Sequence, residues 1–225
     1  MRPEKIDAYE VGYKIRDNNL QLNVAGFFYN YKDIQVTAEG AGGTSVTRNA
    51  ASAHIYGADG DLVWQIVPQF NVNLSGSYIH ARYQSFPDAL GFKQDLDPTS
   101  PSYGLFNTFP VNASGLDVSR TPTVTGNIGG TYSIPFFKGN LDLNASLSYS
   151  SSFYFDSVEQ NKQDGYALLN LRASWTDPSE KYHFQVYGTN VTNKAYFAAS
   201  FYDPFGARSV YGPPLMVGGS VTVRF

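Results

Sequence analysis

Hydrophobic and polar residues alternate one by one along most of this chain. In residues 141–155 the odd positions include Leu141, Leu143 and Leu147, whereas every even position from Asp142 to Ser152 is polar. Such alternation is typical of a β-strand with one apolar and one polar face. The pattern returns at residues 124–134 and 215–225, and in weaker form at 6–15, 20–36, 46–67, 70–83, 166–175 and 182–191. It predicts about nine strands, with an ambiguous phase at residues 25–33.

The connections between these strands alternate in length. Short links fall at residues 16–19, 68–69, 135–139 and 177–180, and long ones at 39–45, 85–121, 156–164 and 192–214. Short turns at one end and long loops at the other are typical of outer-membrane barrels. The fold class is therefore predicted as all-β: an antiparallel transmembrane β-barrel segment of about nine strands in a meander, spanning residues 1–225. An odd set of strands with open edges cannot close in lipid, so we expect an open partial barrel that belongs to something larger.

Composition narrows the function classes. Aromatic residues reach 16%, with 17 Tyr and 16 Phe, and no apolar run approaches the roughly 18 residues that a spanning helix needs. The net charge is −3 and no cluster of Lys and Arg is present, which argues against a nucleic-acid partner. Aromatics gather near strand ends, as in the interfacial girdles of membrane barrels. They are Trp64, Trp175, Tyr132, Phe136 and Tyr182 beside the short links, and Phe153, Phe155, Tyr196 and Phe197 beside the long ones.

Three segments resemble the C-terminal half of TonB-dependent receptors. They are residues 3–14 (PEKIDAYEVGYK), residues 190–196 (NVTNKAY), and residues 212–214 (GPP) followed by a strand that ends in Phe225. The resemblance implies a 22-stranded barrel in the outer membrane of a Gram-negative bacterium, filled by an N-terminal plug. It also implies active uptake of a scarce nutrient, such as an iron–siderophore complex, energised through TonB. Because the first residues contain no apolar stretch of signal-peptide length, we expect the signal peptide, the plug and the first half of the barrel to lie upstream.

Two other readings stay open: a passive porin, and an outer-membrane adhesin or enzyme. No G-x-S-x-G, phosphate loop or suitably spaced Glu pair is present, so we expect no catalytic residues and no cofactor. His54, His80 and His183 are far apart in the sequence, and no metal site is expected.

Candidate functional residues fall into three groups. Charged residues on the polar parity are predicted to face the barrel lumen, where they could pair with the plug or line the path: Glu10, Lys14, Asp142, Arg172 and Arg224. Loop residues could stack on or pair with an anionic small-molecule ligand, or could pack loop against loop instead: Tyr103, Phe106, Phe109, Phe201, Tyr202, Phe205 and Arg208. The family resemblance implies that Phe225, as a terminal aromatic, is read by the barrel-assembly machinery. Besides that machinery, the expected partners are outer-membrane lipids and the TonB complex, which would act through the plug.

Overall fold

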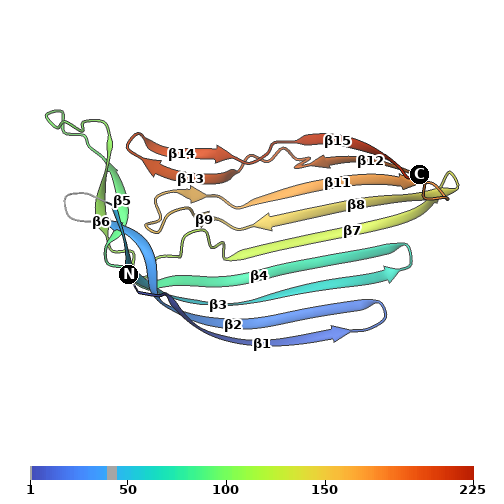
Figure 1. The fold of residues 1–225 in the computed structure, drawn as a ribbon, viewed down its shortest axis with the longest axis horizontal. Coiled ribbons are helices and arrows are strands. Elements are labelled where there is room, and N and C mark those ends of the chain that lie inside the picture. The colour runs from blue at the N-terminus through green and yellow to red at the C-terminus, as the bar shows by residue number, and fades with distance from the viewer. Residues whose placement is uncertain (1, 40–44) are drawn as a thin grey trace.

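The computed structural model describes residues 2–39 and 45–225, and its regular structure is β throughout (Figure 1). Eleven strands form one sheet; β5 and β6 belong to a loop hairpin, and the other nine form a meander that we call the wall. Each wall strand pairs antiparallel with the next, which confirms the predicted fold class. The wall strands are β1 (Lys5–Arg16), β2 (Leu20–Glu39), β3 (Ser45–Val67), β4 (Phe70–Ser85), β7 (Val124–Phe136), β8 (Gly139–Ser150), β11 (Tyr166–Thr176), β12 (Tyr182–Thr189) and β15 (Met216–Val223).

The two ends of the wall differ as the sequence predicted. The four short turns and the C-terminus lie at one end, and the long connections lie at the other (Figure 1). The predicted loop at residues 39–45 falls mostly outside the described residues. β1 and β15 run in the same direction, and within the described residues each has one edge without a strand partner. No helix in the described part of the chain is long and apolar enough to cross a membrane.

The strand register places apolar side chains on one face of the wall and polar ones on the other. Leu147 lies between Ile128 and Leu169, whereas the next residue, Ser148, pairs with Asn127. The apolar face is the more exposed one: Ile128 is 50% exposed and Leu147 is 40% exposed, while Ser148 and Asn127 are half-buried. A water-soluble sheet would show the reverse. We call the apolar side the outer face and the polar side the lumen face.

The phase ambiguity in residues 25–33 has a structural cause. Phe27 and Tyr29 lie on the lumen face with their rings stacked at 5.1 Å, and Phe28 lies on the outer face beside Tyr9. Aromatic residues on both faces remove the alternating signal. The register then shifts beyond Tyr31, where Asp33 has a φ of 55°.

The prediction missed three hairpins within the long connections. They are β5 (Ala89–Gln94) with β6 (Phe106–Val111), β9 (Phe153–Tyr154) with β10 (Lys162–Gln163), and β13 (Phe197–Asp203) with β14 (Gly206–Tyr211). The predicted strand at residues 141–155 was too long. β8 ends at Ser150, because Ser151 closes the pairing with β7: its N–H donates to the Val124 carbonyl at 2.8 Å and its hydroxyl accepts the Val124 N–H at 3.0 Å.

The buried core lies at the long-loop end and not within the wall. Phe86, Ala89 and Ala113 of the longest connection pack against Ala53 and Tyr83. Ala53 and Tyr83 pair with each other on the lumen parity, so this connection folds back over the lumen face. β2 and β3 contain 20 and 23 residues, about twice the 9–11 residues that cross a bilayer. The ends of β2 and β3 at the long-loop side therefore extend past the membrane and support the loops.

Candidate functional site

Three loop hairpins pack together at the open end of the wall. We call them the loop cluster: residues 86–121 with β5 and β6, residues 153–164 with β9 and β10, and residues 195–212 with β13 and β14. The ring of Phe92 on β5 stacks on Tyr202 of β13 at 5.1 Å, and Phe106 of β6 lies 5.8 Å from the same ring. The Phe106 N–H donates to the carbonyl of Pro204 at 2.8 Å. Segments about 100 residues apart are thus joined by aromatic packing and a backbone hydrogen bond.

The second hairpin joins the other two through side-chain amides. Gln160 accepts the N–H of Phe92 and donates to its carbonyl, both at 2.9 Å, so its amide imitates a neighbouring strand. The Nδ2 of Asn161 donates to the hydroxyl of Ser200 at 2.7 Å, and both side chains are buried. The Phe197 N–H donates to Gln163 Oε1 at 2.7 Å. These hydrogen bonds make the three loops one packed unit.

The structure separates the seven predicted ligand-contacting residues into two sets. Phe106 and Tyr202 contribute to packing between loops. Phe201 and Arg208 are cross-strand partners on the opposite face of the β13–β14 hairpin, where Phe201 is 52% exposed. The Arg208 guanidinium lies 5.7 Å from the ring of Phe205 and forms an ion pair with Asp203. An anionic ligand would have to compete with Asp203 for Arg208.

Tyr103 and Phe109 lie in the first part of the loop cluster. They are 58% and 36% exposed, and Phe109 lines a shallow cleft with Asp95. Hydrogen bonds from the hydroxyls of Ser100 and Ser102 hold the pKa of Asp95 below its ordinary value. The carboxylate thus organises the β5–β6 tip, where Leu96 is exposed together with the two aromatic rings.

The segment at residues 190–196 has a structural role in the fold. Asn190, which is 4% exposed and has a φ of 47°, donates from Nδ2 to the carbonyls of Lys194 and Pro213 at 2.9 and 3.1 Å. Asn193 accepts the N–H of Leu215 at 3.0 Å through its side chain. The motif therefore fixes the end of β12 beside the start of β15, which aligns the last two wall strands.

The predicted lumen charges lie on the lumen parity of the wall. Asp142 accepts hydrogen bonds from the Ser133 hydroxyl at 2.5 Å and the Asn140 amide at 2.7 Å. Arg172 is exposed and lies between Asn144 and Tyr187 in the register. Glu10 and Lys14 are exposed on β1; Arg224 follows the end of β15 and lies 3.7 Å from Glu180.

The aromatic girdle expectations have mixed outcomes. Trp64, Tyr132, Phe136 and Tyr182 are between 41% and 47% exposed near the short turns, as expected for an interfacial girdle. At the other end the expectation was wrong for Phe155, which is only 8% exposed and is buried by the loop cluster. Within the described residues, no group of three His, Cys, Asp or Glu side chains could hold a metal ion.

An antiparallel meander with an exposed apolar face, short turns at one end and folded loops at the other is the wall of a transmembrane β-barrel. Residues 1–193 match the family described as "TonB dependent receptor-like, beta-barrel", and the chain belongs to that family. Its members are receptors and transporters of the Gram-negative outer membrane and not enzymes.

Comparison with individual proteins agrees with this assignment. The chain is 23% identical over 193 residues to the pesticin receptor of Yersinia pestis, a match that covers 86% of this chain and 25% of the relative. The ferric yersiniabactin uptake receptor FyuA from Yersinia pestis superimposes with a TM-score of 0.79 at 20% identity, over 99% of this chain and 30% of that one. The ferric preacinetobactin receptor BauA from Acinetobacter baumannii gives 0.71 at 15% identity, over 98% and 30%. The chain thus spans about a quarter of the length of the curated relatives it matches.

Proposed function

We propose that this chain forms the C-terminal part of the barrel of a TonB-dependent transporter that takes up an iron–siderophore complex or a similar scarce chelate. The observation that carries the proposal is the loop cluster, whose longest loop folds over the lumen face at the open end of the wall. Loops that pack together at the open end of the wall are better suited to capture of a specific ligand than to free diffusion through a porin. The similar proteins FyuA and BauA are receptors for ferric yersiniabactin and ferric preacinetobactin, which supports an iron chelate as the substrate class.

Energy coupling would depend on parts of the transporter beyond this barrel segment. A plug that fills the lumen and contacts TonB is the expected source of coupling, and the wall would supply the polar surface against which the plug sits. We assign this role to Glu10, Lys14, Asp142 and Arg172, since all four lie on the lumen parity. Arg224 would act at the periplasmic rim.

Transport assays of the full-length protein test the proposal. Uptake of ⁵⁵Fe-loaded siderophores by iron-starved cells should require both the intact gene and TonB. Uptake that continues at the full rate in a strain without TonB would point to the passive porin instead.

Ligand contact is proposed for the exposed members of the loop cluster. Phe201, Phe205 and Arg208 form one surface on the β13–β14 hairpin, and Tyr103 and Phe109 extend the proposal to the first loop. Phe106 and Tyr202 would act indirectly, by holding the two hairpins together.

Substitution of the hairpin surface should separate these roles. Arg208→Ala and Phe201→Ala should weaken ligand binding without loosening the loops, whereas Tyr202→Ala should do both, because it removes the ring between Phe92 and Phe106. Val11→Ala is a suitable control, as Val11 is 76% exposed and lies on β1, away from the loop cluster. Unchanged affinity in both surface variants would remove this assignment.

We further propose that Phe225 is read by the barrel-assembly machinery. It follows β15 at the short-turn end and is fully exposed. Phe225→Asp should reduce outer-membrane insertion more than Val223→Asp, although Val223 lies deeper on the outer face. If Phe225 were merely another lipid-facing residue, Val223→Asp would do at least as much damage.

A further inference from the structure

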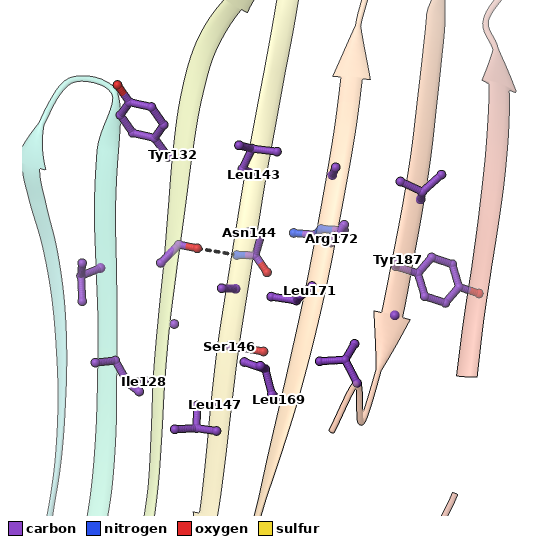
Figure 2. Close-up of a pocket in the computed structure, with 18 of the residues that line it drawn as sticks. Ile128, Tyr132, Leu143, Asn144, Ser146, Leu147, Leu169, Leu171, Arg172 and Tyr187 are labelled. Carbon is purple, nitrogen blue, oxygen red and sulfur yellow. Dashed lines mark hydrogen bonds between the residues drawn. The ribbon is translucent and has the colours of Figure 1, made fainter. Parts of the chain in front are cut away.

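The outer face of the wall contains an apolar depression on the strands near the C-terminus. It is an open hollow of about 850 Å³, and its middle row is Gly130, Ala145, Leu171 and Gly188 in register across β7, β8, β11 and β12. Figure 2 shows the larger side chains that border it, including Ile128, Tyr132, Leu143, Leu147 and Leu169. Ala145 carries only a methyl group, whereas Leu143 and Leu147 on the same strand and Leu171 beside it carry large side chains, so the surface is hollowed there.

A second depression continues the first toward the short turns. It encloses about 450 Å³, is lined by Leu141, Trp175 and Phe184, and shares Ala173 and Val186 with the first. We call the two together the apolar trough. Along β8 it runs from Leu141 to Leu147, which is about 20 Å of strand. At the usual barrel tilt of about 45° this is about 14 Å of depth, close to the half-thickness of a hydrocarbon core of about 30 Å.

A lysine lies where the trough meets the short turns. Lys181, between β11 and β12, lies opposite Arg224 on the lumen parity, but its ammonium group reaches to 5.7 Å from the ring of Tyr182, which shares the outer parity with Phe184. The acids of the same turn are engaged elsewhere. Asp177 accepts the Tyr182 N–H at 2.7 Å and the Ser179 hydroxyl at 2.5 Å, and Glu180 lies 3.7 Å from Arg224.

The neighbouring turn lies beside this one and contributes a second cation. The indole N–H of Trp175 donates to the carbonyl of Phe136 at 2.8 Å, which ties the β7–β8 turn to β11. Lys138 belongs to that turn, and no ion pair is found for it within the described residues. The trough therefore spans a depth close to the hydrocarbon thickness of one leaflet, and its end at headgroup depth is cationic.

We propose that the apolar trough binds a phospholipid of the periplasmic leaflet, with an acyl chain against the middle row and its phosphate at Lys181. Hydrocarbon is the solvent of this face, and the hollow gives one chain more contact than the flanking rows offer. The charges of Lys181 and Lys138 attract a lipid of net negative charge more strongly than a zwitterionic phospholipid, whose phosphate is offset by an amine.

The test uses the full-length protein in detergent, with phosphatidylglycerol as the probe and native mass spectrometry as the readout. Lys181→Glu should lower phosphatidylglycerol retention by about five-fold or more, the factor that one lysine near an anionic lipid surface is worth. Ala145→Leu should lower it by filling the trough. Lys181→Arg keeps the charge and should retain the lipid.

Two matched controls distinguish this site from general effects. Ala58→Leu makes the same change on the outer face away from the trough, and Lys93→Glu makes the same charge reversal in the loop cluster. Equal retention in Lys181→Glu, Ala145→Leu and the wild type overturns the proposal. An equal loss of phosphatidylglycerol in Ala58→Leu also overturns it. So does a wild-type protein that retains lipopolysaccharide in place of phosphatidylglycerol.

Discussion

The hydrogen bond between Asn161 and Ser200 is expected to hold the second and third hairpins of the loop cluster together. Both side chains are buried, and the bond is 2.7 Å long. Asn161→Ala removes it while leaving the backbone bonds of residue 161 to Phe155 and Asp156 in place. The change is thus confined to one contact between segments about 40 residues apart.

The size of the effect depends on the hydrogen bonds that Ser200 retains in the variant. Its hydroxyl still donates to the Arg208 carbonyl at 3.0 Å and lies 2.6 Å from the Ser209 hydroxyl, so it is not left unsatisfied. The loss should therefore be about 0.5–1.5 kcal/mol, which is the range for a net hydrogen bond with little orphan penalty. That corresponds to a roughly 2–13-fold rise in the opening equilibrium of the hairpin.

Hydrogen exchange of the full-length protein is the appropriate assay. Amides of β13 and β14 should exchange faster by that factor, whereas amides of the β11–β12 pair in the wall should not change. Asn112→Ala is the matched control, because Asn112 is exposed and bonds only locally, to the N–H of Ser114.

A double substitution makes the test specific. In a Ser200→Ala background, Asn161→Ala should have little further effect, since the shared bond is already gone. Fully additive effects, or unchanged exchange in the single variant, would refute the conclusion that this bond joins the loops.

Three further outcomes are expected of the full-length protein. Leu147→Arg should lower folding stability in lipid by about 2–4 kcal/mol in urea titrations, while Ser146→Arg, one residue away on the lumen face, should be tolerated. A larger loss of stability in Ser146→Arg than in Leu147→Arg would invert the assignment of faces. Gly212→Ala should lower the thermal midpoint, because an added Cβ would lie 2.0 Å from the Tyr196 ring, and an unchanged midpoint would show that this ring moves freely. Asp95 has a lowered pKa in the folded loop, so its contribution to the stability of the β5–β6 tip is present above the ordinary pKa of about 3.9 and is lost as the pH falls through the folded-state pKa. Amide exchange at the tip should therefore accelerate only under that acidification.

The wall could be predicted from the sequence because its physics is local. Each wall strand needs one apolar side for lipid and one polar side for the lumen. Apolar and polar residues therefore alternate along the strand, as in Leu143, Asn144 and Ala145. The prediction lost its phase at Phe27 and Phe28, where both faces are aromatic. It also ran past Ser150, because Phe153 continues the alternation although the chain leaves β7 at Ser151.

The loop cluster could be predicted only in part because its stability comes from contacts between distant segments. A turn signal for β13–β14 was present in residues 203–206, where a proline and a glycine separate the aromatic-rich residues 196–202 from residues 207–211, which end in Val210 and Tyr211. Gly206 has a φ of 114°, as that turn requires. Nothing local indicates that Gln160 would pair with the backbone of Phe92, 68 residues away.

This division between wall and loops bears on how the mouth could respond to a ligand. The wall strands are joined by continuous backbone ladders. The hairpins of the loop cluster are joined by single backbone bonds, from Phe106 to Pro204 and from Arg120 to Tyr154, by side-chain bonds from Gln160 and Asn161, and by the stack of Phe92 on Tyr202. Such regions open at a lower free energy than a sheet does. A ligand that contacts Phe201 or Arg208 would therefore act on the β13–β14 hairpin first, and through these bonds on the other two hairpins, while the wall stays fixed. Motion of all three hairpins together, with no change in the wall, is the behaviour that this arrangement favours.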